Sequence, residues 1–509
     1  MRADIALAFA VGAWSLLGQF IFNRIIFFYV ANSEYTAASI ITLHLAGFWL
    51  GATWARKRRL GIRTLLAGAA AITLLAEILV WRMGIVWFSL PALIALTAVG
   101  GISLATMSGA TITRLMRSAT NDHAQRVFMA DTAGSVLGAL VGGFWLIPHF
   151  GIAAAFHGLL LAQVVALAVI MKPRRVGTAI AAAGMLMVLF LQATGPTLAA
   201  KPQVIAVEGM PIAERSAGEA LVYSRRSPYG LISITGKPGR NLGLNIDSRP
   251  LCVVTDQPAE NADSTSWRLG AMPIRMMIPA SGRADLNVAN IGLGCGLTLA
   301  AMVDAISAKS HMDLIEINPE MPAAQKSFWP LLPTNPSDPR VTTTIDDGFR
   351  YFAERNPTLP KYDAVAMDVA WMQNMSATHL FSAEMYLNIR RNLADDGVLS
   401  VRVEETDPFS KVSLISFRTL AQVFPHVNVS LAGGVVVFYA SPTRGDLANF
   451  LTDEDNRLTD WVREASDGMP VNRLDDLAMN RAKFTAAGGS TWEQLEAKYA
   501  GMRRMLKGE

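Results

Sequence analysis

The stretch that decides the fold runs from residue 288 to residue 318 and reads VANIGLGCGLTLAAMVDAISAKSHMDLIEIN. It predicts a strand, a turn with three glycines, a helix and a second strand that ends in Glu316. Because glycine has no β-carbon, Gly292, Gly294 and Gly296 would let the backbone turn sharply and approach a ligand closely. An acidic side chain after the second strand can accept from ribose hydroxyls. The stretch therefore indicates a nucleotide-binding unit, although an ordinary strand-to-helix turn would show the same glycine spacing.

Hydropathy divides the 509-residue chain into two parts. Long apolar runs dominate up to about residue 200, and the remainder has the mixed charge and proline content of a soluble domain. Most of the apolar runs are long enough to cross about 30 Å of hydrocarbon, which predicts a seven-helix transmembrane domain. They lie at roughly 5–30, 37–55, 64–81, 85–113, 127–147, 151–171 and 176–199. The 85–113 run contains Pro91, Gly100 and Gly101, so a broken or re-entrant segment is the alternative there.

Basic residues between these runs predict the orientation of the chain. They gather in the second, fourth and sixth connections, and only Arg82 stands out in the others. The positive-inside rule places those connections and the N-terminus in the cytoplasm, so the soluble part is expected on the outer side of the membrane. The same residues explain most of the net charge of +4, so no nucleic-acid partner is indicated. The basic residues are Arg56, Lys57, Arg58, Arg59, Arg63, Arg114, Arg117, Arg126, Lys172, Arg174 and Arg175.

Glycines at positions 134, 138 and 142 lie four residues apart on one predicted helical face, where two membrane helices can approach closely. The two cysteines, Cys252 and Cys295, do not make a disulfide framework or a metal site. We expect small buried thiols, with a disulfide as the alternative if the domain faces an oxidising compartment. The seven histidines show no spacing typical of metal ligands, so no metal is expected.

The soluble part is predicted to be an α/β Rossmann-like domain. Strands expected at about 286–291, 311–317, 341–345, 362–369 and 397–403 alternate with helical stretches, which is typical of a parallel doubly wound sheet. A last pair, near 426–431 and 434–440, is joined too tightly for a crossover helix and should be antiparallel. The expected order is a transmembrane domain at 1–200, a connector and β-hairpin region at 201–284, the Rossmann-like domain at 285–445 and a helical tail at 446–509.

Carboxylates follow several of these strands, and ligands in such sheets bind at the carboxyl ends of the strands. Asp346 and Asp347 follow the third strand, where Asp347 would either meet an adenine amino group or cap the next helix. Asp368 ends the apolar strand AVAMD, where a carboxylate is costly unless it is used or paired. Together with Glu316 and the glycine turn, these residues predict a ligand site.

These motifs resemble the polyamine aminopropyltransferases, the spermidine synthase family, which share the class I methyltransferase fold. The membrane half is also similar to the multi-pass segment fused to this family in many bacteria, through LHLAGFWLGATWARKRR and RVFMADTAGSVLGALVGGFWLIPHFG. The resemblance in the soluble half covers about 220 residues. It lies in SPYG, IGLGCG, LIEINPE, DPRVTTTIDDGFRYF, YDAVAMDV, FSAEMYLNIRRNLADDGVLSV, FPHVNV and VVVFYASP.

The resemblance implies a sulfonium nucleoside, S-adenosylmethionine or its decarboxylated form, bound over residues 292–296, including Cys295. It implies Glu316 at the ribose, Asp347 near the base, and Asp368 as the catalytic acid that receives or orients the attacking amine. An alkyl ammonium must lose a proton before it can attack carbon, and a positioned carboxylate assists this step. Such donors and polyamines are made in the cytosol, which argues for the alternative, a cytoplasmic soluble domain.

The chain departs from the family pattern mostly where an amine would bind. Cys295 replaces the aspartate of the glycine turn, and only the first carboxylate of the next motif is kept, as Asp368. We therefore predict a membrane-anchored transferase whose amine-type acceptor is not putrescine, with the bilayer, a nucleoside and a small amine as partners and a homo-oligomer left open. A non-catalytic transporter, or an assembly or sensor protein, is the alternative. The other replaced positions are Gly230, Ser266, Trp267, Arg268, Val369, Ala370 and Trp371.

Overall fold

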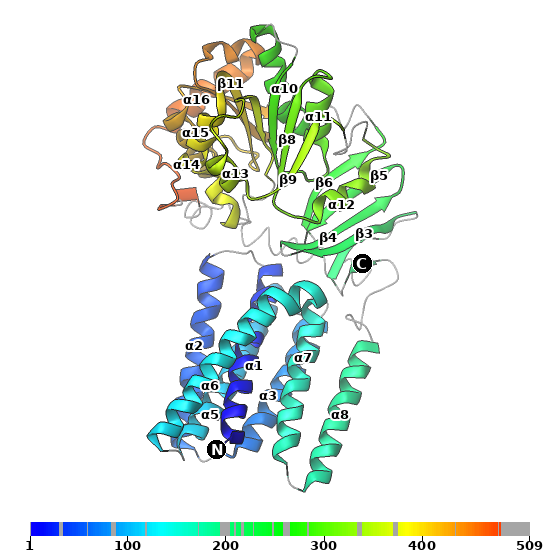
Figure 1. Ribbon diagram of the computed structural model, residues 1–509, viewed down its shortest axis with the longest axis vertical. Coiled ribbons are helices and arrows are strands. Elements are labelled where there is room, and N and C mark those ends of the chain that lie inside the picture. Colours follow the sequence, from blue (N-terminus) through cyan, green and yellow to red (C-terminus); the bar gives the residue numbers. More distant parts are fainter. Residues whose placement is uncertain are drawn as a thin grey trace. The chain divides into compact units, whose positions relative to one another are not determined.

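The computed structural model describes residues 2–29, 34–58, 60–82, 88–117, 120–171, 173–193, 204–207, 210–214, 218–227, 229–246, 249–257, 265–281, 285–332, 338–369, 375–432, 434–476 and 478–479. The chain divides into two units within these residues, Met1–Arg215 and Ser216–Thr491 (Figure 1). Trp371 and Ala370, on which two of the predicted departures fall, lie outside the described residues.

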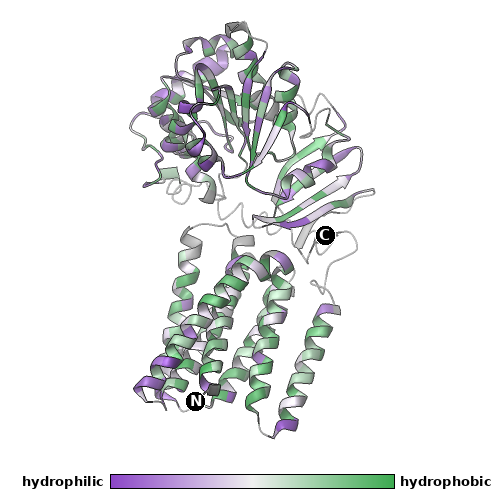
Figure 2. Cartoon of the chain, in the orientation of Figure 1, coloured by the Kyte–Doolittle hydropathy of each residue, from purple (hydrophilic) through white to green (hydrophobic). Residues whose placement is uncertain are grey.

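The first unit is helical, and Figure 2 shows its long helices as mainly hydrophobic. Seven helices in the described part of the chain are long and apolar enough to cross a membrane, which confirms the seven predicted segments. The helix at Leu90–Arg117 is continuous, so the alternative of a broken or re-entrant segment there is wrong for the described residues. The helices are α1 (Arg2–Tyr29), α2 (Glu34–Lys57), α3 (Ile62–Ala76), α5 (Leu90–Arg117), α6 (Asn121–Leu140), α7 (Ile147–Ile170) and α8 (Arg174–Ala193).

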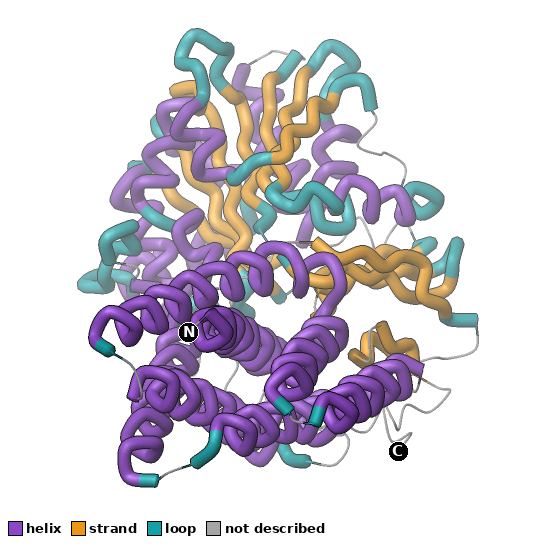
Figure 3. The backbone as a smooth tube through the Cα atoms, turned by 60° about the horizontal axis from the view of Figure 1, so that its bottom comes forward, coloured by secondary structure: helices purple, strands orange, loops and turns teal. Residues whose placement is uncertain are grey.

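The helices of this unit lie side by side (Figure 3), and glycines allow the closest approach. A β-carbon added at Gly134 of α6 would lie 1.9 Å from the carbonyl oxygen of Phe9, and one at Gly138 would lie 2.1 Å from that of Ala13. Phe9 and Ala13 both belong to α1. The predicted glycine face therefore packs against α1, as small residues in membrane helices do. Two π-helical turns, Glu77–Arg82 and Val141–Leu146, continue α3 and α6, and the short strands β1 (Val204–Val207) and β2 (Met210–Glu214) pair antiparallel.

A seven-stranded sheet forms the core of the second unit. Its order is β12-β13-β11-β10-β7-β8-β9, with the pairs among β7 to β11 parallel and β13 antiparallel to both β11 and β12. This topology confirms the predicted Rossmann-like fold and its antiparallel last pair. The strands are β7 (Asn287–Ile291), β8 (His311–Glu316), β9 (Val341–Ile345), β10 (Tyr362–Met367), β11 (Leu393–Val403), β12 (His426–Ala432) and β13 (Val435–Ser441).

Helices cover both faces of this sheet, because its central strands are buried on both sides. Alternate residues of β10 enter different cores: Val365 packs with the side of α13 to α16, and Ala364 packs with the side of α10 to α12. A strand buried on both faces reads as a continuous apolar run, which explains the sequence YDAVAM. The helices are α10 (Thr265–Ser281), α11 (Leu297–Ala305), α12 (Met321–Gln325), α13 (Gly348–Glu354), α14 (Ala383–Asn392), α15 (Lys411–Val423) and α16 (Asp453–Ala465).

A separate antiparallel sheet precedes the seven-stranded one. The predicted hairpin is its central pair, β4 (Gly230–Lys237) and β5 (Asn241–Ile246), joined by a turn that contains Gly239 at φ 75°. Two further strands complete it, β3 (Ala220–Ser227) and β6 (Arg249–Thr255). Its apolar residues, including Ile232 and Leu244, join the core on the α10 side of the larger sheet.

Candidate functional site

The glycine turn connects β7 to α11 at the carboxyl end of the sheet. Gly292, Gly294 and Gly296 have φ values of 95°, 49° and 86°, a region that side chains with a β-carbon rarely adopt. A β-carbon at Gly294 would meet only the sulfur of Cys252, at 3.9 Å, so this part of the turn is open. Asn290, in β7, stabilises the turn by donating a hydrogen bond from its side-chain amide to the Gly292 carbonyl at 2.8 Å.

Glu316 ends β8 and is bonded directly to the turn. Its Oε2 accepts from the Leu293 backbone N–H at 2.9 Å, and its Oε1 accepts from the Asn318 backbone N–H at 2.8 Å. The residue is only 6% exposed, and burial raises the pKa of its carboxyl above the usual 4.5, while the backbone hydrogen bonds oppose that rise. The predicted pair of a glycine turn and an acidic strand end is therefore one hydrogen-bonded structure.

The SPYG segment reaches the same site from the antiparallel sheet. Asn318 donates its side-chain amide to the Ser227 hydroxyl at 3.1 Å, and Ser227 in turn donates to the Gly230 carbonyl at 2.8 Å. Burial raises the pKa of the Tyr229 hydroxyl, and the charges of Asp347 and Glu316 raise it further. Tyr229 therefore lies near both carboxylates, although its side chain is half exposed.

Asp347 is the N-cap of α13. Its Oδ1 accepts from the backbone N–H groups of Phe349 at 2.8 Å and Arg350 at 3.2 Å. Its Oδ2 lies 3.4 Å from Nε2 of His379, and the hydrogen bond from His379 lowers the pKa of the Asp347 carboxyl. Of the two expectations for this residue, the capping one is confirmed. Oδ1 thus makes the cap, and Oδ2 is the oxygen that faces His379.

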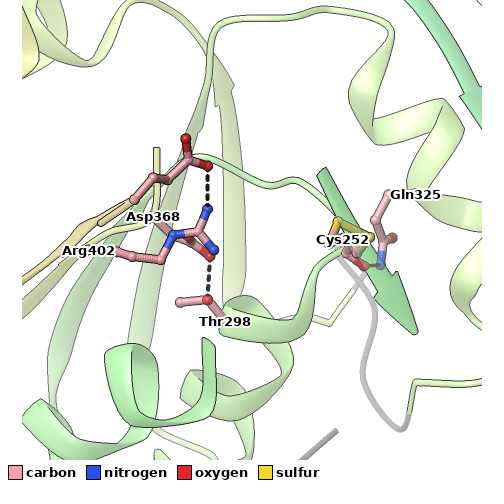
Figure 4. Close-up of a disulfide and its surroundings, with 7 residues drawn as sticks. Cys252, Thr298, Gln325, Asp368 and Arg402 are labelled. Carbon is pink, nitrogen blue, oxygen red and sulfur yellow. Dashed lines mark hydrogen bonds and ion pairs between the residues drawn. A yellow bond between two sulfur atoms is a disulfide. The ribbon is translucent and has the colours of Figure 1, made fainter. Parts of the chain in front are cut away.

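Asp368 follows β10 and lies beside the glycine turn. Its backbone N–H donates to the Ile291 carbonyl at 2.9 Å, and its Oδ2 accepts from the Thr298 hydroxyl at 2.6 Å. Its Oδ1 lies 3.2 Å from Nε of Arg402, which comes from β11 (Figure 4). Neither Oδ1 nor Nε, both buried, makes an aligned hydrogen bond. The two groups are thus an ion pair by distance, and Oδ1 keeps the ability to accept from a donor.

Cys252 and Cys295 form a disulfide, so the expectation of small buried thiols is wrong. Their Cα atoms are 6.2 Å apart, although 43 residues separate them in the sequence. The bond joins β6 of the antiparallel sheet to the glycine turn, and Cys295 is buried within it. On the other side of the turn, Gln325 of α12 donates to the Cys295 carbonyl at 3.4 Å. The turn is therefore fixed at the residue where the resemblance led us to expect an aspartate.

The structure brings the glycine turn, Glu316 and Asp368 together, with Asp347 at the end of β9 on the same edge of the sheet. Two partners of Asp368 were missed from the sequence, Thr298 and Arg402. Met367 pairs with Val401 across the parallel strands β10 and β11, so Asp368 and Arg402 are the next residues in line. A charged residue directly after each of two apolar runs, AVAM and VLSV, was the available signal, and it identifies this pair only once the two strands are known to be neighbours.

Among the described residues, no group of three or more His, Cys, Asp or Glu side chains is arranged to hold a metal ion. Residues 266–268 lie in α10, but their side chains are not among those described, so their predicted departure from the family stays a prediction.

Comparison with known proteins gives a consistent result. Residues 283–437 match the Spermine/spermidine synthase domain. Polyamine aminopropyltransferase 1 of Streptomyces coelicolor is 26% identical over 403 residues, which cover 75% of this chain and 71% of that protein. The polyamine aminopropyltransferase of Desulforudis audaxviator is 31% identical over 137 residues, 26% of this chain and 47% of that protein. The spermidine synthase of Thermotoga maritima is 19% identical and matches with a TM-score of 0.38, over 55% of this chain and 88% of that one.

The similarity to the Streptomyces coelicolor protein extends well beyond residues 283–437. The matched domain contains the glycine turn, Glu316, Asp347, Asp368 and Arg402. The resemblance inferred from the sequence motifs is therefore confirmed, and the chain carries a spermine/spermidine synthase domain in its α/β unit.

Proposed function

We propose that this protein is a membrane-anchored transferase that binds decarboxylated S-adenosylmethionine at the glycine turn and moves its aminopropyl group to an amine. One observation carries the proposal: the Glu316 carboxylate is fixed to the Leu293 N–H within the turn, so that the acidic group and the turn present one prearranged surface. The matched domain and the named relatives support the choice of an alkyl donor.

The ribose of the donor would lie at Glu316 and its base near Asp347. Each oxygen of Glu316 accepts from a backbone N–H, and the Ile317 N–H gives a third hydrogen bond. A carboxylate offers about four lone-pair sites, so one is left for a ribose hydroxyl. Oδ2 of Asp347 is positioned to accept from an exocyclic amino group, in competition with His379. The open side of Gly294 would leave room for the nucleoside.

The reaction forms a C–N bond and breaks a C–S bond. The amine nitrogen attacks the carbon beside the sulfonium, the C–S electron pair returns to sulfur, and methylthioadenosine leaves as a neutral thioether. The attacking amine must first give up a proton, for which Oδ1 of Asp368 is the candidate acceptor on this edge of the sheet. Thr298 would hold the other oxygen and so orient the carboxylate.

We further propose that the soluble unit faces the periplasm. Two independent observations support this orientation: the basic residues of the second, fourth and sixth connections, and the Cys252–Cys295 disulfide. Disulfides persist in oxidising compartments and are rare in the cytosol. An alkaline phosphatase fusion after Glu509 is expected to be active, whereas a fluorescent protein fusion that folds only in the cytosol is expected to be dark. The reverse pattern would overturn the orientation.

A non-catalytic sensor or assembly protein is the second candidate, and the Asp368–Arg402 pair favours it over a plain spermidine synthase. The experiment that separates the two uses the purified full chain with decarboxylated S-adenosylmethionine and a panel of amines. Release of methylthioadenosine that depends on an added amine, and that Asp368→Asn abolishes, supports the transferase. Nucleoside binding without any such release, across monoamines and diamines, would support the sensor instead.

A further inference from the structure

We propose that Arg402 takes the place of one substrate ammonium, so that the acceptor is a monoamine rather than a diamine. The inference rests on the proposed function, because it concerns the acceptor side of the same site. It names the class of acceptor and a specificity-determining residue, Arg402, which the sequence motifs did not single out.

The guanidinium of Arg402 lies beside the Asp368 carboxylate. Asp368 and Arg402 follow the last paired residues of two neighbouring parallel strands, Met367 and Val401, and their charged groups meet at 3.2 Å. Figure 4 shows Arg402 beside Asp368, whose carboxylate also accepts from the Thr298 hydroxyl. The carboxylate that would receive an amine therefore already has a cation beside it.

Two carboxylates, those of Asp368 and Glu404, share the one guanidinium of Arg402. The guanidinium of Arg402 also pairs with Glu404, at 3.4 Å from Nη2 to Oε1. Two carboxylates and one guanidinium carry a formal charge of −1. One ammonium balances this charge, and a second one would leave the group positive.

The positive charge of Arg402 is a permanent feature of the site. An arginine side chain stays protonated in proteins, so no change of pH within the physiological range removes this charge. The Arg402 side chain is 14% exposed, and its stem lies on β11, in the middle of the sheet. A diamine would have to displace the guanidinium from two carboxylates, which leaves a partly buried charge unpaired.

The Asp368 carboxylate can still accept a hydrogen bond from one ammonium. Oδ2 is occupied by the Thr298 hydroxyl, whereas Oδ1 is close to Arg402 without an aligned hydrogen bond. An amine donating to Oδ1 would therefore satisfy a buried acceptor. The geometry fits one attacking amine, because the second carboxylate of this cluster, Glu404, already pairs with Arg402.

The test compares butylamine with putrescine, which differ by a single ammonium group. Both amines are titrated calorimetrically into the purified full-length protein, with and without saturating methylthioadenosine. The wild-type protein is expected to bind butylamine at least as tightly as putrescine. Arg402→Gln should raise the preference for putrescine over butylamine about tenfold, because one positive charge is removed beside the bound amine.

Two further variants control the interpretation. Arg463→Gln removes an arginine charge from the exposed face of α16, where it pairs with Asp460, and should leave the ratio of the two dissociation constants unchanged. The double variant Asp368→Asn/Arg402→Gln removes both charges and should lose the gain seen in Arg402→Gln. If Arg402→Gln is unstable, the double variant is compared with Asp368→Asn alone, because those two proteins differ only at Arg402. The double variant should then prefer putrescine more strongly, and an equal ratio in the two would overturn the role of Arg402.

The outcomes separate this inference from the proposed function. A wild-type protein that prefers putrescine tenfold, an Arg402→Gln protein with an unchanged ratio, or a failure of both amines to bind either protein would overturn the role of Arg402. Absence of methylthioadenosine binding would instead overturn the proposed function, and the amine ratio measured without nucleoside would still decide the role of Arg402.

Discussion

The carbonyl oxygen of Asp368 lies directly against Gly292, so that a β-carbon at Gly292 would come within 2.3 Å of it. Asp368, the proposed proton acceptor, is thus in backbone contact with the glycine turn, where the nucleoside is proposed to bind. The same two segments are joined by the hydrogen bond from the Asp368 N–H to the Ile291 carbonyl. We expect the two halves of the site to respond together when this contact is disturbed.

Gly292→Ala tests the contact. The substitution forces a residue with a β-carbon into φ 95° and against a backbone carbonyl, so it should lower the free energy of unfolding by about 3 kcal/mol. Gly239→Ala is the matched control, because Gly239 also has positive φ but nothing within 4 Å of the added atom, and it should cost only about 1 kcal/mol. Urea denaturation of the full chain in detergent measures both values. Equal costs would show that the contact with Asp368 is unimportant.

The Cys252–Cys295 disulfide should be present in native membranes. Denaturing the protein without reductant, in the presence of a polymer-linked maleimide, should label no thiol, and prior reduction should expose two. Cys252→Ser should lower the free energy of unfolding by about 4 kcal/mol, since the two cysteines close a loop over a sequence separation of 43 that is freed in the unfolded chain. Labelling of both cysteines without reductant would argue against the bond and against the outward orientation that it supports.

Asp347 should make the stability of the protein depend on pH in the acid range. Its folded-state pKa is held below the usual 3.8 by His379, so its contribution is present above 3.8 and is lost as the pH falls through the lower folded-state value. Asp347→Asn should retain the N-cap but abolish this part of the acid sensitivity. Asp347→Ala should also lose the cap, at a cost of about 1 kcal/mol at neutral pH. Acid titration of unfolding for the three proteins checks both effects, and identical acid profiles would contradict the pairing with His379.

Asp368→Asn should lower the rate of transfer about 10²–10⁴-fold, which is the contribution usual for a positioned acid or base. The dissociation constant of methylthioadenosine should change less than about twofold, since Asp368 is placed on the acceptor side of the turn. Initial rates with decarboxylated S-adenosylmethionine and butylamine, combined with calorimetry, separate the two quantities. A variant that keeps the wild-type rate would remove Asp368 from the reaction.

The sequence predicted the elements of the fold well, because each was specified locally. The β9 strand was expected at 341–345 and is Val341–Ile345, and the two glycines at 433 and 434 correctly predicted an antiparallel pair. The β11 strand begins at Leu393, four residues before the expected start at 397. The expectation was wrong there because the first residues of the strand, LADD, have the composition of a turn.

The missing parts of the site depend on distances between segments far apart in the chain. Cys252 and Cys295 meet only because β6 runs beside the glycine turn, and no spacing rule gives that neighbourhood. Arg402 sits within an apolar strand and acquires its meaning only once β11 is known to pair in parallel with β10. The proximity of Glu316 to the turn could be predicted from the sequence, because both lie within one βαβ unit; its role at a ribose stays a prediction.

The central claim is that the glycine turn and Glu316 hold a sulfonium nucleoside, and calorimetric titration of methylthioadenosine into the full-length protein tests it most directly. The account predicts saturable binding at one site per chain, weakened at least tenfold in Glu316→Gln because one carboxylate oxygen that accepts a hydrogen bond becomes a donor. Arg463→Gln serves as the control for the preparation and should bind as the wild type does. No saturable binding, or equal affinity in the wild type and Glu316→Gln, would contradict the claim.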